Sequence, residues 1–506
     1  MNTFDEWSLS LAVFLPLVGM AGVLITPKGA EFAQKVIALS SAVLTFIVGI
    51  YIVTRFHWES GDVQLGVSKQ WIPLINARYD VGVDGIGLPL LLLSMFISVL
   101  VIIYSWDHFP EPHNPRGFLA LMLLLEVGMN GTFVAQDLIL FFVFFEIVLL
   151  PMFFMIGVWG GPNRKYASLK FFLFTLFGSA LMLLGFLALF FISGARTFSI
   201  TGLTHMAQTG TLNIDSTTAL WIFGGLFLGF AIKVPMFPFH TWLPDAHTEA
   251  PTQGSVLLAA ILLKLGTYGF VKIAMPILPE ASQTWAPYIG ALAVIGIIYG
   301  SLCCLAQTDV KRLIAFSSVA HMGFVMLGIS TRTTLGMNAA LFGMVAHGLI
   351  TGMLFFCAGS IQHRFDTREI ARLGGLLKNA PRLGWIFGFS AMASLGLPGL
   401  AGFWGEFPAV LSAFQPAEGQ SVELFRVYMV VAAIGTVLAA GYLLWMFQRV
   451  AFGEVKEEFA DAHIHDVHVT EWLAWTPILA LIVVFGVYPD LLFRYFNAPI
   501  TALFGG

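Results

Sequence analysis

The sequence predicts an all-α protein that crosses a membrane many times, and two observations support this fold class. Of the 506 residues, 58% are apolar and only 11% are charged, and the mean hydropathy is +0.85. Water-soluble domains carry about 25% charged residues. Stretches of roughly 20 apolar residues, the length of a membrane-spanning helix, also recur from end to end. The composition excludes a water-soluble protein, and the small, scattered net charge of -4 gives no indication of a nucleic-acid partner.

Apolar windows bounded by turns and charged residues predict about 14 transmembrane helices. They begin near Ser8, Val36, Gly85, Phe118, Leu138, Leu169, Ala219, Gly254, Ile289, Leu313, Gly336, Leu383, Phe425 and Trp472. The segment before the first helix, Met1–Trp7, contains Asp5 and Glu6 but no basic residue, unlike a cleavable signal peptide. We therefore expect the first helix to stay in the mature protein.

Proline and glycine interrupt the seventh and twelfth of these helices. The first interruption, Lys233–Pro238, contains Pro235 and Pro238, and the second, Gly396–Gly402, contains Pro398. These residues break the helical hydrogen-bond ladder, which a membrane tolerates only where the backbone is buried in protein or lines a water-filled cavity. A matched pair of broken helices is typical of transporters built from repeats.

The spacing of the two interruptions predicts two inverted five-helix repeats. Residues 1–117 would then form three helices, residues 118–277 and 286–450 the two repeats, and residues 451–506 a C-terminal loop and helix. About 15 of the 25 lysines and arginines lie in odd-numbered loops, against about 7 in the even loops and the C-terminal end. Because short cytoplasmic loops are enriched in Lys and Arg, we expect the odd loops in the cytoplasm and both termini on the periplasmic side.

Four charged residues lie deep within the predicted helices: Glu146, Lys233, Lys264 and Glu406. An ionisable side chain at the centre of a bilayer costs about 3 kcal/mol, so such residues indicate function by default. The alternative is a set of ion pairs that hold the helices together, but a buried pair gains little over well-packed apolar side chains. For Glu406 another alternative is a position near the end of its helix, from which it reaches the interface.

His321 and His347 also lie in apolar helical runs, and histidine titrates near neutrality, which suits a proton relay. The alternative for both is a histidine that is hydrogen-bonded in the core. Near the helix ends, Lys272 is interpreted as a snorkelling side chain and Asp137 as a helix N-cap. Glu126 fits a structural and a functional role equally well.

The sequence contains no phosphate-binding loop or nucleophile elbow in a suitable context. Its cysteines, Cys303, Cys304 and Cys357, lie in apolar runs without metal-ligand spacing. Residues 463–468 contain three histidines, but their acidic, loop-like surroundings favour a solvated segment over a metal site. We therefore predict no covalent catalytic residue, no cofactor site and no metal site in this chain, which leaves transport of something that the buried groups can bind and release.

In five motifs the chain resembles the antiporter-like, proton-pumping membrane subunits of respiratory complex I, and the similarity covers nearly all of its length. The motifs are FEIVLLPM at 145–152, KVPMFPFHTWLPDAH at 233–247, EAPTQGSV at 249–256, DVKRLIAFSSVAH at 309–321 and GLAGFWGE at 399–406. The resemblance implies a proton-transfer row made of Glu146, Lys233, Lys264, His321, His347 and Glu406.

Within this row, the resemblance implies that Glu146 and Lys233 form a carboxylate–lysine pair and that Lys264 is the central lysine. Glu406 would be the terminal group of the outward half-channel. Sister subunits of the family generally carry lysine at this last position. The glutamate therefore favours the chain M branch of the family.

The resemblance also implies partners and a location. The chain would be a subunit of a proton-translocating NADH:quinone oxidoreductase in the bacterial inner membrane, beside other membrane subunits that include homologous antiporter-like chains. NADH, FMN, iron–sulfur clusters and quinone would be bound by other subunits, and quinone reduction there would drive proton transfer here. Two alternatives stay open: a subunit of a multisubunit sodium/proton antiporter, and a structural membrane subunit whose ion pairs only fix helix packing.

Overall fold

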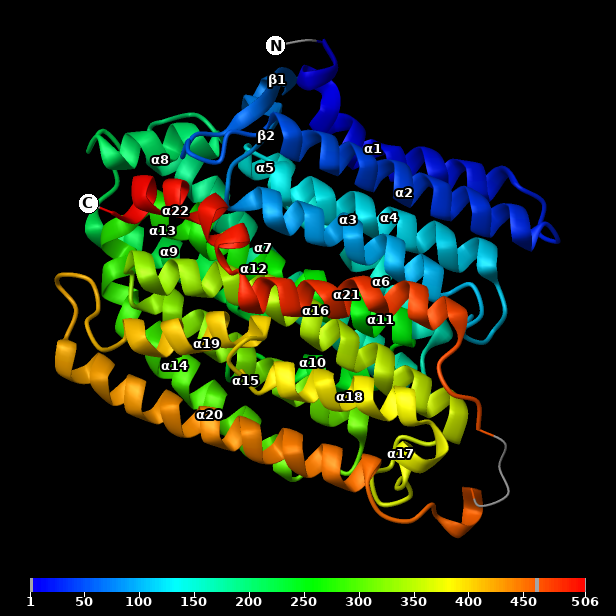
Figure 1. Ribbon diagram of the computed structural model, residues 1–506. Helices are drawn as coiled ribbons and strands as arrows, with labels where there is room; N and C mark the ends of the chain where they lie inside the picture. Colours follow the sequence, from blue (N-terminus) through cyan, green and yellow to red (C-terminus); the bar gives the residue numbers. More distant parts are fainter. Residues whose placement is uncertain (1–2, 460–463, 506) are drawn as a thin grey trace.

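The computed structural model describes residues 3–459 and 464–505. Within this part of the chain, thirteen helices are long and apolar enough to cross a membrane, and they lie side by side (Figure 1). The N-terminal elements are α1 (Thr3–Ile25), α2 (Glu31–Arg55), β1 (Gln64–Ile72), a 3₁₀ turn (Pro73–Ile75), β2 (Ala77–Val83), α3 (Gly87–Tyr104) and α4 (Pro115–Val134).

The middle of the chain contains both short and long helices. They are α5 (Leu138–Ile147), α6 (Leu149–Trp159), α7 (Arg164–Ile192), α8 (Ile200–Gln208), α9 (Ser216–Lys233) and α10 (Trp242–Glu249). The next membrane span is divided into α11 (Thr252–Leu257), α12 (Leu263–Gly269) and α13 (Met275–Ile277), which are joined by π-helical turns at Leu258–Leu262 and Phe270–Ala274.

The C-terminal part follows the same pattern of long helices and one broken span. Its elements are α14 (Pro279–Leu305), α15 (Val310–Ser330), α16 (Thr334–Phe365), α17 (Leu376–Asn379), α18 (Pro381–Ser394), α19 (Ala401–Ser412), α20 (Val422–Ala451), a 3₁₀ turn (Glu457–Phe459), α21 (Val469–Val487) and α22 (Asp490–Phe504). In Figure 1, α1 and α2 form one edge of the bundle, α20 forms the opposite edge and α16 runs through the middle.

The predicted all-helical membrane fold is confirmed. Thirteen of the predicted helices correspond to the thirteen apolar helices, and the twelfth corresponds to the broken pair α18 and α19. The predicted start of the ninth, Ile289, was wrong, since α14 begins at Pro279. Pro279 occupies the first turn, where its missing N–H costs nothing, and Pro287 lies inside the same helix. The division into two inverted five-helix repeats stays a prediction.

Both predicted interruptions are present. Helix α9 ends at Lys233 and α10 begins only at Trp242, while α18 ends at Ser394 and α19 begins at Ala401. Pro235 and Pro238 lie in the first gap, and Pro398 lies in the second. The second gap also contains Gly396 and Gly399 at φ +79° and +93°, a backbone conformation that side chains with a Cβ rarely adopt.

The apolar-window criterion does not predict four elements at one end of the bundle, because none of them is a long apolar run. Strands β1 and β2 pair antiparallel, with Lys69 opposite Tyr79, and the turn between them places Asn76 at φ 53°. Helices α8 and α22 lie at the same end, where the Gln208 amide donates to the Ala502 carbonyl. The described chain ends lie there too, since Lys69 pairs with Glu6 and α22 closes the chain.

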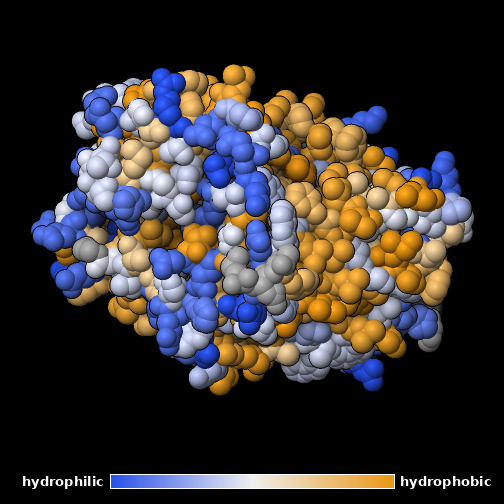
Figure 2. Space-filling view, turned by 90° about the horizontal axis from the view of Figure 1, so that it is seen from above, coloured by the Kyte–Doolittle hydropathy of each residue, from blue (hydrophilic) through white to orange (hydrophobic). Residues whose placement is uncertain are grey.

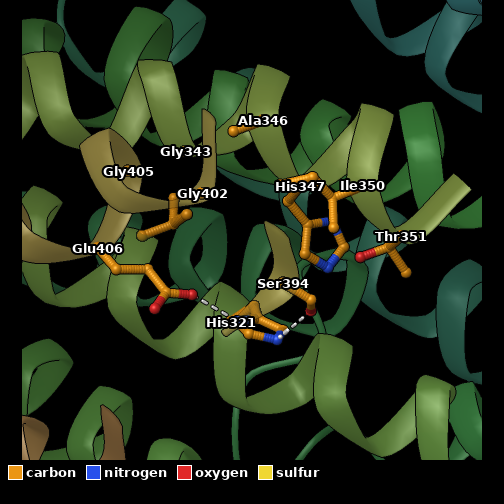
Figure 3. Close-up of a pocket in the computed structure, with 11 residues that line it drawn as sticks. His321, Gly343, Ala346, His347, Ile350, Thr351, Ser394, Gly402, Gly405 and Glu406 are labelled. Atoms are coloured by element: carbon orange, nitrogen blue, oxygen red, sulfur yellow. Dashed lines mark hydrogen bonds and ion pairs between the residues drawn. The ribbon is translucent and has the colours of Figure 1, made fainter. Parts of the chain in front are cut away.

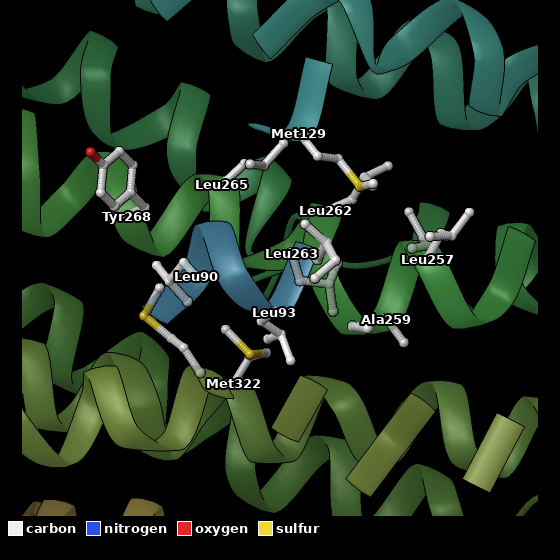
Figure 4. Packing of buried hydrophobic residues seen from close by; sticks show 14 of the residues in the cluster. Leu90, Leu93, Met129, Leu257, Ala259, Leu262, Leu263, Leu265, Tyr268 and Met322 are labelled. Atoms are coloured by element: carbon white, nitrogen blue, oxygen red, sulfur yellow. The ribbon is translucent and has the colours of Figure 1, made fainter. Parts of the chain in front are cut away.

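Burial divides the helices into an outer and a central group. The best apolar windows of α2, α20 and α21 are no more than 39% buried, whereas those of the span 252–277 and of α16 are wholly buried. Figure 2 shows a broad apolar area on one face, with hydrophilic residues gathered toward its left and right edges. Around the central span, Leu262 and Leu263 pack among the side chains of neighbouring helices, including Leu93 and Met322 (Figure 4). The helix that carries Lys264 is therefore, with α16, one of the two most buried helices of the described chain.

Candidate functional site

Lys264 lies wholly buried on α12, directly after a π-helical turn. Its ammonium donates to the Ala259 carbonyl at 2.5 Å and lies 2.7 Å from His347 Nδ1 on α16. π-Helical turns are rare in α-helices and occur frequently at functional sites. This turn supplies the carbonyl that holds Lys264, and it directs the lysine to a titratable partner.

A second contact joins His321 on α15 to Glu406 on α19. His321 Nδ1 lies 2.5 Å from Glu406 Oε1, and its Nε2 lies 3.1 Å from Ser394 Oγ and 3.3 Å from the Tyr442 hydroxyl. The break between α18 and α19 brings Ser394 and Glu406 to the same histidine (Figure 3). Glu406 therefore contacts His321 inside the protein, with 12% of its side chain exposed, and does not extend to the membrane interface.

A small cavity separates these two contacts. It measures about 20 Å³ and is lined by His321, His347, Thr351, Ser394 and Glu406, together with small residues of α16 and α19. This is enough space for one water molecule. The ring centroids of His321 and His347 are 6.0 Å apart, and within the described residues His347 Nε2 has no hydrogen-bond partner. One water in this cavity would lie between His347 and the contact of His321 with Glu406 (Figure 3).

Glu146 and Lys233 do not form a direct salt bridge in this structure. The Lys233 ammonium lies 4.8 Å from the centroid of the Phe145 ring, next to Glu146 in the chain, and Glu146 is the carboxylate whose charge acts on it. Helices α9 and α12 approach closely, since a methyl group on Gly266 would lie 3.1 Å from Lys233 Cβ. Lys233 of α9 thus packs against α12 within one helical turn of Lys264.

Sequence reasoning missed a polar cavity at the end of the bundle opposite the hairpin. It has a volume of about 380 Å³, and its lining includes His108, Glu249, Lys311 and the exposed Asp366. The Lys311 ammonium donates to the Ala250 carbonyl. Burial lowers the pKa of His108, although the nearby Glu471 opposes this effect. A surface-connected polar cavity thus ends at a buried lysine.

Between this cavity and Lys264 lies His247, another residue that sequence reasoning did not single out. It is completely buried and stacks on Phe355 with ring centroids 4.5 Å apart. In the described part of the chain neither of its ring nitrogens has a hydrogen-bond partner. The charges that act on it are those of Lys311 and Lys264. The sequence did contain a signal for both residues, because His247 ends the motif at 233–247 and Lys311 lies in the motif at 309–321.

The other buried acidic and basic residues named in the sequence analysis either have a hydrogen-bond partner or, among the described residues, lack one. The interpretation of Lys272 as a snorkelling side chain was wrong, because its ammonium is buried and lies 2.5 Å from Asp84 Oδ2. Asp137 is the predicted N-cap and accepts hydrogen bonds from the Ile139 and Leu140 amides. Glu126 is wholly buried, and among the described residues its carboxylate oxygens find no partner. Across those residues no group of histidine, cysteine and acidic side chains has metal-binding geometry, and His463 lies outside them.

The comparisons with known proteins agree with this geometry. The family described as NADH:quinone oxidoreductase/Mrp antiporter matches residues 135–444, and the family described as NADH-ubiquinone oxidoreductase chain 4, amino terminus, matches residues 11–132. NADH-quinone oxidoreductase subunit M of Rhodobacter capsulatus is 40% identical over 96% of this chain and 93% of its own length. The chain belongs to the subunit M family of NADH-quinone oxidoreductases. Another member, from Rickettsia prowazekii, is 39% identical over 98% of both chains.

Solved structures place the subunit M family among antiporter-like folds. A chain of respiratory complex I from Thermus thermophilus with bound NADH superposes with a TM-score of 0.86, at 30% identity over 98% of this chain and 100% of that one. A chain of the Mrp complex from Dietzia superposes with a TM-score of 0.84 at 18% identity, over 99% and 98% of the two chains, and shows the fold alone. Subunit M is the antiporter-like, proton-translocating membrane subunit of the oxidoreductase, which confirms the family and function expected from the sequence.

Proposed function

We propose that Lys264, His347, His321 and Glu406 carry the proton through this subunit M. One observation supports the proposal above all others: contacts of 2.7 Å and 2.5 Å join these residues in two pairs, and a cavity with space for one water lies between the pairs. Proton transfer needs heavy atoms within hydrogen-bond reach, directly or through one water. The row meets this requirement across four helices, α12, α16, α15 and α19, and the second helix break.

At the Glu146 and Lys233 end of the row, proton binding depends on the electrostatic interaction between the carboxylate and the lysine. A carboxylate near a buried lysine favours the protonated ammonium, and loss of that neighbour favours release of the proton. Glu146 and Lys233 are close enough to interact but not bonded to each other, so a small movement changes their coupling. We propose that quinone reduction elsewhere in the complex shifts this pair, and that the shift passes to Lys264 and along the histidines to Glu406.

The polar cavity beside Lys311 is the proposed side of proton uptake, with His247 as the step between Lys311 and Lys264. The cavity opens at the end of the bundle that carries the odd-numbered loops, which we assign to the cytoplasm because of their Lys and Arg content. Both termini would then be periplasmic.

Replacing Lys311 with methionine is expected to slow proton uptake by proteoliposomes about tenfold, because the first buried acceptor is lost. Arg312→Met, at the exposed neighbouring position, serves as the control, and equal rates in the two variants would contradict this route.

The proposed complex is respiratory complex I of the bacterial inner membrane. The chain resembles subunits M over almost their entire length, and redox cofactors reside in other subunits of such complexes. We assign NADH, FMN, the iron–sulfur clusters and quinone to those subunits, and we propose homologous antiporter-like chains as membrane neighbours. The buried groups of this chain bind and release protons only.

Replacing His347 with asparagine tests the row directly. Asparagine cannot take up a proton from Lys264, so the transfer must pass through water. We expect the rate of proton transfer through this subunit to fall about tenfold. The number of protons pumped per NADH oxidised by the whole complex should fall as a result. The measurement is proton uptake by proteoliposomes that contain the whole complex. His205→Asn, at an exposed position on α8, is the matched control. An unchanged proton-to-NADH ratio in His347→Asn would refute the proposal.

A sodium/proton antiporter subunit is the second candidate, because the matching family description also covers Mrp antiporters. Such a subunit would bind Na⁺ with the same carboxylates. The two functions differ in one measurement, namely proton release from the purified complex when sodium is added. Release that depends on sodium supports the antiporter, and release that depends only on NADH oxidation supports complex I.

A further inference from the structure

A large apolar cavity lies on the side of the bundle, away from the proton-transfer row. It has a volume of about 560 Å³, and its lining atoms are almost all apolar. Phe46 and Ile50 of α2 form one wall, Ala480 and Phe485 of α21 form the other, and Leu491 of α22 closes one end. Ile50 is 47% exposed and Ala480 is exposed too, so the cavity opens toward the hydrocarbon of the bilayer.

The closed end of this cavity lies at the membrane interface. Helix α22 buries one face, with Leu492, Phe496 and Ile500, and exposes polar residues on the other. A short helix with this pattern lies in the plane of the interface. Its position between the ends of α2 and α21 marks the level at which lipid headgroups meet the protein.

Arg494 of α22 is located between the ends of the two helices that wall the cavity. Its guanidinium lies 5.9 Å from the ring centroid of Trp58, which follows α2, and 6.0 Å from that of Tyr488, which follows α21. Tryptophan and tyrosine are the residues that gather at headgroup level in membrane proteins. The three side chains together form a headgroup-level site at the α22 end of the apolar cavity.

The charges of this site indicate a zwitterionic ligand. A hollow of about 320 Å³ beside Arg494 is lined by Trp58, Glu59, Asp490 and Asn497. It therefore presents one guanidinium and two carboxylates, and Arg494 Nη2 lies 3.1 Å from Asp490 Oδ2. A guanidinium binds phosphate, and carboxylates bind an ammonium. An anionic headgroup would leave both carboxylates facing negative charge.

We propose that this surface binds one phospholipid of the phosphatidylethanolamine type. One acyl chain fills the apolar cavity between α2 and α21, the phosphate binds Arg494, and the ammonium binds Asp490 and Glu59. The size of the cavity supports an acyl chain as its occupant. A transmembrane helix of a neighbouring subunit, about 10 Å wide and 30 Å long, is far too large for it.

Native mass spectrometry of the complex purified in detergent tests the headgroup site. After delipidation, addition of phosphatidylethanolamine is expected to restore one bound lipid, with about tenfold tighter binding than phosphatidylglycerol. Arg494→Gln is expected to weaken phosphatidylethanolamine binding about tenfold, because a charge-assisted phosphate contact is lost. Arg426→Gln is the matched control, since Arg426 is an exposed arginine of α20 that stacks on Phe414 instead. Equal binding of the two lipids, or equal loss in both variants, would overturn the proposal.

The acyl-chain cavity is tested by filling its mouth. Ala480→Trp places a large side chain where the chain would enter and is expected to abolish retention of the lipid, whereas Ala433→Trp at an exposed position of α20 leaves it unchanged. If Ala480→Trp prevents folding, the Arg494→Gln comparison decides alone. Full retention of the lipid in a folded Ala480→Trp variant, or a neighbouring subunit occupying the cavity in the assembled complex, would contradict the proposal.

Discussion

Replacing Lys264 with methionine is expected to stop proton transfer through this subunit, with a rate at least about 100-fold lower than in the wild type. Methionine fills similar space but cannot hold a proton. Lys264 is wholly buried and donates to His347, so no water can replace it without opening the core. The measurement is the number of protons pumped per NADH oxidised, in proteoliposomes that contain the assembled complex.

The same experiment separates transport from a purely structural role. If the buried ion pairs only fix helix packing, Lys264→Met reduces the amount of assembled complex but leaves the proton-to-NADH ratio of that complex normal. The proton-to-NADH ratio does not depend on the amount of assembled complex, so it separates the two roles. Lys69→Met is the control, because Lys69 lies on β1 with 59% of its side chain exposed. A normal ratio in assembled Lys264→Met complex would rule out the proton-transfer row.

Replacing Glu406 with glutamine is expected to lower the rate by a similar factor of about 100. The amide keeps the shape of the side chain but cannot accept a proton from His321, which lies 2.5 Å from the carboxylate. Oxygen Oε2 of Glu406 is buried and, in the described residues, unpartnered, so the contact with His321 occupies only one of the two carboxylate oxygens. Proton uptake by proteoliposomes again measures the effect.

Two further variants make the Glu406 result specific. Glu406→Asp keeps the carboxylate on a shorter side chain and should retain part of the rate, since one water can extend the contact to His321. Glu423→Gln, at an exposed position in the first turn of α20, should behave as the wild type. If Glu406→Gln pumps as well as Glu423→Gln, the carboxylate is not the terminal group of the row.

The membrane helices could be predicted from the sequence because a physical length limits them. A bilayer requires about 20 apolar residues per helix, and this signal is strong and local. Proline and glycine marked both helix breaks for the same reason, since their effect on the backbone is also local. Strands β1 and β2 gave no such signal, because their turn depends on Asn76 in a left-handed conformation and on pairing across the hairpin.

The buried residues of the row could be chosen from the sequence, but their partners could not. The cost of burying charge singles out Lys264 and Glu406, whatever they contact. Contacts depend on residues far apart in the chain, and Lys272 shows the difference. Its partner Asp84 lies 188 positions away, before a different helix, and no local pattern links the two. The separation of Glu146 from Lys233 is likewise a matter of packing between α5 and α9.

The π-helical turns on either side of Lys264 give its helix a mechanical property. Each turn contains one residue more than an α-helical turn, so a shift of both turns along the helix would rotate the segment between them. A shift by one residue turns the intervening segment by about 100°. Such a shift would rotate Leu263–Gly269 between the helices of Lys233 and His347 without displacing Thr252 or Ile277. The two π-helical turns would thus let the central lysine rotate between its neighbours about the axis of its own helix.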